Sequence, residues 1–121
     1  MRLYLIKDKT SMKRALQEAH QDLSEEGLDE TCFFRSKLVF SELASNAVKH
    51  ATGGGNIRVE VFVDRVEITL SCATPILLPK ESNCSTVYEE SGRGLYLIDS
   101  VCHSRESTKE GGLKVVLVRF R

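Results

Sequence analysis

A long stretch without a helix breaker limits what this chain can fold into. Neither proline nor glycine occurs between Asp29 and Thr52, and Gly53-Gly54-Gly55 then ends the segment. Asp29 or Thr31 can open a helix of about twenty residues here. At about 100° per residue, its second half carries one apolar stripe, made of Phe40, Leu43, Ala44, Ala47 and Ala51. Such a helix is the natural backbone of a packed core.

Three polar residues lie on the side of this helix opposite the stripe. Glu42, Asn46 and Lys49 are spaced at i, i+4 and i+7, which aligns them along one ridge. A carboxylate can activate a hydroxyl or water, an amide oxygen can hold a hard cation, and an ammonium can meet phosphate. On spacing alone, an ordinary solvated helix face is the commoner explanation.

The remaining patterns predict an α+β chain. The expected order is a strand at residues 2–6, a helix at 11–23 capped by Ser11, the long helix, a hairpin of strands at 56–63 and 66–72, a loop at 73–91, a helix at 95–101, and strands at 103–107 and 113–120. The first helix has its own apolar stripe, made of Met12, Ala15, Leu16, Ala19 and Leu23. We therefore expect one domain over residues 1–121, a two-layer α/β sandwich whose mixed, mostly antiparallel sheet is covered by about three helices.

Charge and cysteine content exclude several classes of function. Seventeen basic residues balance seventeen acidic ones, so we expect no bulk attraction to nucleic acid or to a membrane surface. The cysteines (Cys32, Cys72, Cys84 and Cys102) have neither zinc-site spacing nor the regularity of a disulfide framework. The first eight residues place charges within a short apolar run, unlike a signal peptide. A cytoplasmic location is the expectation.

A glycine motif follows the loop at 73–91, which is long enough to act as a lid. Ser91-Gly92-Arg93-Gly94 precedes the helix that starts at Leu95, where unpaired backbone N–H groups favour phosphate. The glycines would let the backbone approach a ligand, and Arg93 would add a permanent charge. A turn that needs positive φ, with a solvated arginine, remains the structural alternative.

Together, these motifs resemble those of a known family. The run from Glu42 to Ala51 (ELASNAVKHA) resembles the N-box of the histidine-kinase-like ATPases, the GHKL or Bergerat-fold group. The run from Ser91 to Leu95 resembles the second glycine box of their anti-sigma-factor serine kinase branch. The resemblance covers nearly the whole chain and implies a Bergerat-type sandwich that binds ATP or ADP with Mg²⁺.

The resemblance also implies roles for individual residues. Glu42 would be the catalytic base, and Asn46 would be the Mg²⁺ ligand. The other residues implied at the nucleotide are Lys49 and His50 near the phosphates, and Gly92, Arg93, Gly94 and Leu95 of the glycine box around the triphosphate. The implied partners are a sigma factor and an anti-anti-sigma protein of the STAS type, with a homodimer as a further expectation.

Two positions depart from the family pattern. Cys72 stands where the family has an aspartate that accepts a hydrogen bond from the adenine amino group, and Ala73 follows instead of the usual glycine. A thiol is a weak acceptor and cannot replace a carboxylate, although Cys72 is also in phase with the core residues of its strand. Leu113 and Lys114 follow Gly112 where the family often has an adenine-binding threonine.

These departures leave two functions open. One is a protein-serine kinase or ATPase that regulates a sigma factor or its antagonist. The alternative is a catalytically degenerate module that binds partners without turning over ATP.

Overall fold

The structure, a computed structural model, describes residues 1–50, 54–72, 102, 104–107 and 113–118. Its elements along the chain are β1 (Arg2–Ile6), α1 (Lys9–Ser24), α2 (Glu30–His50), β2 (Gly55–Val61), β3 (Arg65–Cys72), β4 (Ser104–Ser107) and β5 (Leu113–Val118). For His50, Cys72, Ser107 and residues 113–118, only the backbone is described. The predicted loop at 73–91 and helix at 95–101 lie outside the described residues.

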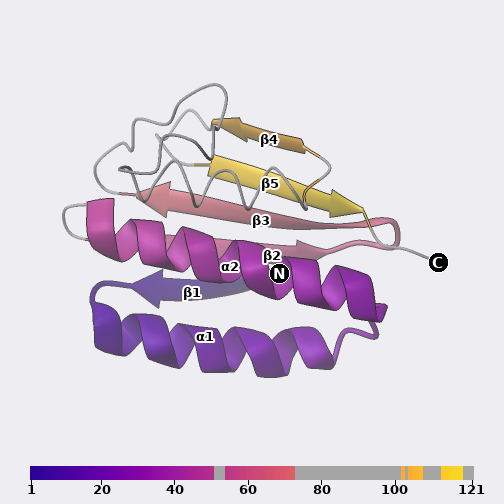
Figure 1. The fold of residues 1–121 in the computed structure, drawn as a ribbon, viewed down its shortest axis with the longest axis horizontal. Coiled ribbons are helices and arrows are strands. Elements are labelled where there is room, and N and C mark those ends of the chain that lie inside the picture. The colour runs from indigo at the N-terminus through magenta and orange to yellow at the C-terminus, as the bar shows by residue number, and fades with distance from the viewer. Residues whose placement is uncertain (51–53, 73–101, 103, 108–112, 119–121) are drawn as a thin grey trace, which may run out of the picture.

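The five strands form one sheet in the order β1-β2-β3-β5-β4. The sequence had predicted a mixed, mostly antiparallel sheet, and all four pairings between the described strands are antiparallel. The two helices lie on the same face of this sheet, with α1 beside β1 and α2 crossing in front of β2 and β3 (Figure 1). The α+β two-layer class predicted from the sequence is confirmed.

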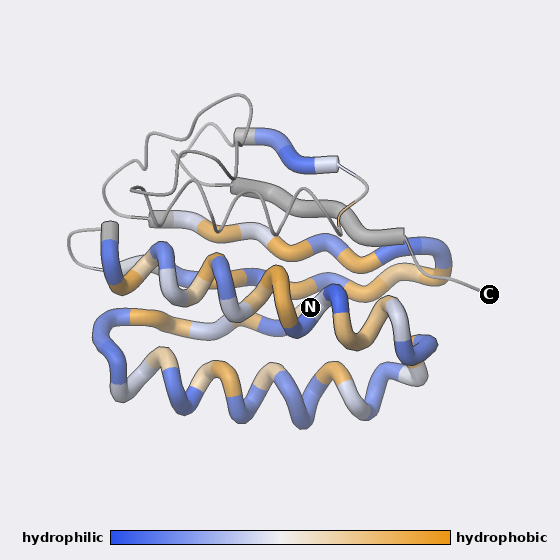
Figure 2. Tube along the Cα trace, in the orientation of Figure 1, coloured by the Kyte–Doolittle hydropathy of each residue, from blue (hydrophilic) through white to orange (hydrophobic). Residues whose placement is uncertain are grey.

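The core lies between the helices and the sheet. It joins the inward residues of the first three strands to the facing stripes of α1 and α2, which Figure 2 shows as apolar segments repeated along each element. The largest fully buried side chains are Phe40, Ile6, Leu43, Ile57, Ile68, Leu70, Val39 and Val66. The predicted stripe of α1 is confirmed, since Ala15, Ala19 and Leu23 are buried and Met12 and Leu16 pack against them.

Tyr4 connects β1 to both helices. Its ring meets Phe40 of α2 edge to face, with the ring centroids 5.1 Å apart. Its hydroxyl donates a 2.6 Å hydrogen bond to Oδ2 of Asp22 on α1, and Arg2 pairs with the same carboxylate at 3.2 Å. Burial, helped by this hydrogen bond to Asp22, raises the pKa of the Tyr4 phenol.

The starts of both helices are capped by aspartates. Asp8, and not Ser11 as the sequence had suggested, is the N-cap of α1. Ser11 occupies the third helical position and completes a capping box: its N–H donates to Asp8 Oδ1 at 2.8 Å, and its hydroxyl accepts from the Asp8 N–H at 2.9 Å. In α2, Asp29 Oδ2 accepts from the Cys32 N–H at 3.1 Å, which selects Asp29 over Thr31.

The β2–β3 hairpin ends earlier than its sequence pattern indicated. The alternation had predicted a strand over residues 56–63, but β2 stops at Val61 and Val63 is 92% exposed. The Phe62 N–H donates to the Arg65 carbonyl at 2.8 Å and closes the turn. The guanidinium of Arg65 lies 4.1 Å from the Phe62 ring centroid and binds Glu67. The chain therefore reverses before the apolar alternation ends.

Several elements meet at one edge of the sheet, by which we mean the side formed by the ends of the strands and not an outer strand. β1, β3 and α2 all end there, and β2 and β5 begin there (Figure 1). Gly54, which leads into β2, has φ +76°, and a Cβ at this position would lie 2.1 Å from the Ile6 carbonyl oxygen. Only glycine can make this close approach, because any side chain would collide with the β1 backbone.

We predict that Gly54→Ala destabilises the protein by about 2 kcal/mol or more, because strain at positive φ adds to a clash with backbone atoms. Gly27→Ala is the matched control: Gly27 also has positive φ, 69°, but a Cβ there would meet nothing within 4 Å. Its expected cost is about 1 kcal/mol. Urea unfolding of both variants measures the difference, and equal losses would contradict the role assigned to the Ile6 contact.

A second prediction concerns pH and the cap of α1. The Ser11 N–H bond to Asp8, followed by the Ser11 hydroxyl, lowers the pKa of Asp8 from its ordinary value of 3.8. The charged cap therefore stabilises the fold above about 3.8, and this contribution is lost as pH falls through the lowered value. Asp8→Asn keeps a capping oxygen that does not titrate. The free energy of unfolding should be higher for the wild type than for Asp8→Asn at pH 7. This difference should shrink at pH 3, where the Asp8 carboxylate begins to be protonated.

Candidate functional site

The last turns of α2 carry the residues that the sequence had singled out. Asn46 is only 5% exposed, Glu42 one turn earlier is half-buried, and Lys49 is exposed. The three side chains therefore differ in solvent exposure, whereas the commoner explanation of their spacing was a helix face that is solvated throughout. A carboxylate and an amide are both drawn partly or wholly out of water at this end of the helix.

The burial of Asn46 follows from how α2 packs. Val39, Leu43 and Asn46 form a row at spacings of four and three, and the first two are 0% exposed. Because α2 contacts α1 on one side and β2, β3 and β5 on the other, its buried arc is wider than the predicted stripe. Asn46 lies at the border of this arc. Its amide is therefore held by packing, which is a requirement for a precise ligand.

The end of α2 and the end of β3 lie at the same edge of the sheet. Cys72, the last residue of β3, pairs with Gly55 at the start of β2, just after the chain leaves α2. In Figure 1 the C-terminal end of α2 and the arrowhead of β3 are on the same side of the molecule. The backbone thus brings the C-terminal end of α2, which carries Asn46 in its last turns, and the position of Cys72 to the same side of the sheet.

Several predicted site residues are not tested by the structure. Gly92, Arg93, Gly94 and Leu95 lie outside the described residues, as does the proposed lid. The side chains of His50 and Cys72 are likewise undescribed. What the structure positions is the half of the site built on α2.

The donor set at this edge fits a magnesium ion shared with phosphates. Among the described residues, no three His, Cys, Asp or Glu side chains gather as a metal cage. Mg²⁺ typically takes few protein ligands and completes its shell with water and phosphate oxygens. A buried asparagine one turn after a half-buried glutamate on the same helix is compatible with that mode. The base-binding side fits less well, since residue 72 is a cysteine.

The structure also shows buried polar residues that the sequence analysis had not singled out. Ser36 and Thr69 are 0% and 7% exposed. The Ser36 hydroxyl lies 4.0 Å from the sulfur of buried Cys32, about three turns before Asn46 on α2. Its position in the row with Val39 and Leu43 was the signal that could have identified it, because that row also defines the true buried arc.

Neither of the two described helices is long and apolar enough to cross a bilayer.

Comparison with known proteins identifies the family. The sequence profile of the histidine kinase-like ATPase domain matches residues 6–120. Three sequences of serine-protein kinase RsbW from Staphylococcus epidermidis, two of them from named strains, are each 31% identical over a 101-residue alignment, which covers 70% of this chain and 64% of each relative. The chain thus spans less than two thirds of the length of these curated relatives.

The match reaches from the end of β1 to the last described strand, so it includes the run on α2 that resembles the N-box and the run at residues 91–95 that resembles the glycine box. The fold, with two helices packed on one face of an antiparallel sheet, agrees with it. The chain belongs to the histidine kinase-like ATPase family, which confirms the assignment made from its motifs.

Proposed function

We propose that this chain is an ATP-binding regulatory domain of the anti-sigma-factor kinase type. In this proposal it binds ATP or ADP with Mg²⁺ at the edge where α2 and β3 end. It phosphorylates a serine of a STAS-type partner, sequesters a sigma factor, or does both. The observation that carries the proposal is the buried Asn46 beside the half-buried Glu42, in a chain that the family profile matches over residues 6–120.

Each residue of α2 has a distinct part in the proposed transfer. Glu42 accepts the proton of the attacking serine hydroxyl while the terminal phosphoryl group leaves the ADP oxygen for the serine oxygen. The Asn46 amide oxygen holds Mg²⁺, which supplies positive charge against the phosphates when bound. Lys49 and His50 would lie near the phosphates in this proposal, and the triphosphate would be wrapped by the glycine box of Gly92, Arg93, Gly94 and Leu95.

Base recognition is the weak part of this site. A lost charge-assisted hydrogen bond costs about 1.5–3 kcal/mol, or one to two decades of affinity. With Cys72 in place of the family's aspartate, binding of ATP is expected to weaken accordingly. Preference for adenine over guanine should also fall, because a carboxylate that accepts from the adenine amino group would reject the guanine carbonyl.

A second candidate function rests on the same residue. If Cys72 and Ala73 prevent productive nucleotide binding, the domain acts as a partner-binding module that does not turn over ATP. The family's partners remain the proposed ones, a sigma factor or a STAS protein, and we extend to this chain the family's homodimer. A cytoplasmic location suits partners of this kind.

Calorimetric titration of Mg²⁺·ATP, Mg²⁺·ADP and Mg²⁺·GTP into the wild type and Cys72→Asp tests the nucleotide site. We expect weak binding by the wild type with little preference between ATP and GTP. Cys72→Asp should bind ATP about ten to a hundred times more tightly and prefer it over GTP, because the carboxylate restores the acceptor.

Absence of binding in both proteins would refute the nucleotide site. Tight, adenine-selective binding by the wild type would instead show that another group replaces the missing aspartate. That result would favour the protein-serine kinase over the partner-binding module.

The catalytic assignment is tested by phosphoryl transfer to a cognate STAS domain. Glu42→Gln should lower the transfer rate about 10²–10⁴-fold while nucleotide affinity changes little, because only the base is removed. Glu30→Gln is the matched control, since Glu30 is an exposed glutamate in the first turn of the same helix. Equal transfer rates for Glu42→Gln and the control would exclude Glu42 as the base, whereas absence of transfer by the wild type would favour the partner-binding alternative.

A further inference from the structure

A cavity separate from the proposed nucleotide site lies between α1 and α2. Its volume is about 520 Å³, within the range of roughly 300–1,000 Å³ that is typical of small-molecule sites. Leu16, Ala19 and Leu23 of α1 and Phe40 of α2 form its apolar lining. Ala19, Leu23 and Phe40 are core residues, so the lining is held by the packing of the two helices.

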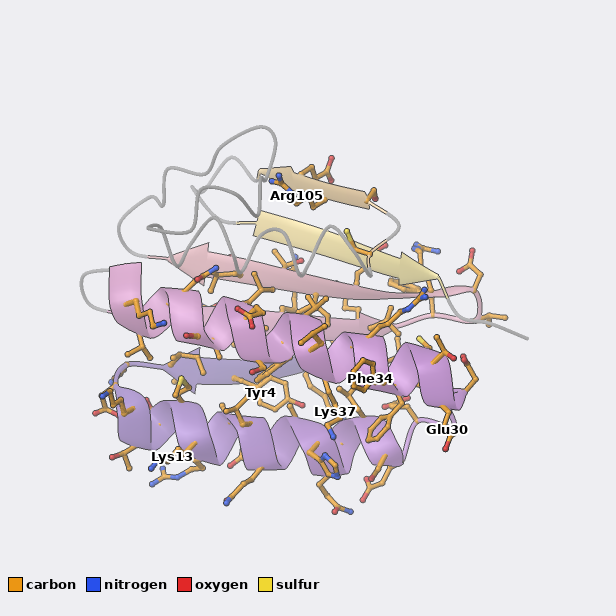
Figure 3. All side chains as sticks on the ribbon, in the orientation of Figure 1. Tyr4, Lys13, Glu30, Phe34, Lys37 and Arg105 are labelled. Atoms are coloured by element: carbon orange, nitrogen blue, oxygen red, sulfur yellow. The ribbon has the colours of Figure 1, made fainter. Side chains whose placement is uncertain are left out.

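The polar groups at this cavity include a lysine and no acidic side chain among the described lining residues. Lys37 of α2 and His20 of α1 line it together with a glutamine and a serine. Lys37 extends from α2 toward α1 (Figure 3). The lining therefore offers hydrogen-bond donors and positive charge over an apolar floor, which complements an anion with an apolar tail.

Phe33 brings the two basic side chains together. The Nζ of Lys37 lies 5.1 Å from the Phe33 ring centroid, and the His20 ring meets Phe33 edge to face at 5.5 Å. The ring face attracts the ammonium and limits its range of positions, so the charge is already placed at the mouth of the cavity. Placing the charge in advance lowers the entropy lost when an anion binds.

The cavity belongs to a different flank of α2 from Glu42 and Asn46. Lys37, Phe40 and Ser41 follow the i, i+3, i+4 spacing of one face, whereas Glu42 and Asn46 lie on a row about 140–180° away around the helix axis. An occupant of this cavity would therefore not enter the proposed nucleotide site.

The size of the cavity favours a compact ligand over a partner's helix. The lining covers residues 16–23 of α1, about 10 Å of helix, and residues 37–41 of α2, about 6 Å. An isolated helix needs about 12–15 residues, or roughly 20 Å, to be stable. We propose that the cavity between α1 and α2 binds a single-chain anionic amphiphile, such as a free medium-chain carboxylate, with Lys37 facing the carboxylate and the chain over Leu16 and Phe40.

The test uses decanoate as the probe, below its micelle concentration, in calorimetric titrations of the whole chain. Saturable binding is expected, with decanol at least tenfold weaker because it lacks the charge, and no binding of decyltrimethylammonium. Lys37→Met keeps the apolar stem and should weaken decanoate at least tenfold, while Lys37→Arg retains most of the affinity. Lys13→Met is the control, since Lys13 is an exposed lysine of α1 outside the lining.

Equal affinity for decanoate and decanol, or equal effects of Lys37→Met and Lys13→Met, would overturn the proposal. Absence of saturable binding would also overturn it and leave a docking protein segment as the better occupant. Thermal unfolding of each variant checks that the fold is retained. The inference does not depend on the nucleotide proposal, because Mg²⁺·ATP titrated into Lys37→Met should behave as it does with the wild type.

Discussion

The arrangement of the first half of the chain depends on the contacts of Tyr4. Its ring packs on Phe40 of α2, and its hydroxyl binds Asp22 of α1, so a strand residue ties both helices to the sheet. Burial and the hydrogen bond to Asp22 raise the pKa of the phenol above its ordinary value of 10.0, so the hydroxyl remains a donor to Asp22 beyond the neutral range as well as within it. The two helices also pack directly against each other, so Tyr4 adds a link through β1 to the contact between them.

Much of the fold was predictable because its patterns are local. The apolar stripe of α1, the long uninterrupted run of α2 and the alternation of the hairpin each determine one element. The predictions were wrong where two local structures were compatible with the same residues. Asp8 and Ser11 are both good N-caps, and they form one capping box. Val63 continues the alternation, but turn geometry and not hydropathy decides where a strand ends.

The candidate site was predictable in identity but not in environment. The spacing of Glu42 and Asn46 placed them on one ridge, and the family motif supplied their roles. The burial of Asn46 could not be deduced from that spacing, because it depends on α2 packing against α1 and the sheet at once. The grouping of polar side chains around Lys37 could not be predicted from the sequence either, since residues from two helices form it. Such tertiary juxtapositions have no local signal.

The exposed tip of the β2–β3 hairpin has a practical consequence. β3 runs from this tip to the edge where α2 ends, so Val63 and Cys72 are separated by roughly 30 Å of extended chain. Val63 makes little contact with the core, no residue of the tip is among the described lining residues of the cavity, and the tip lies at the opposite end of β3 from the proposed nucleotide edge. A tether or fluorophore attached there would leave both surfaces accessible, which makes this position a natural anchor for immobilising the domain in single-molecule or surface-based binding measurements.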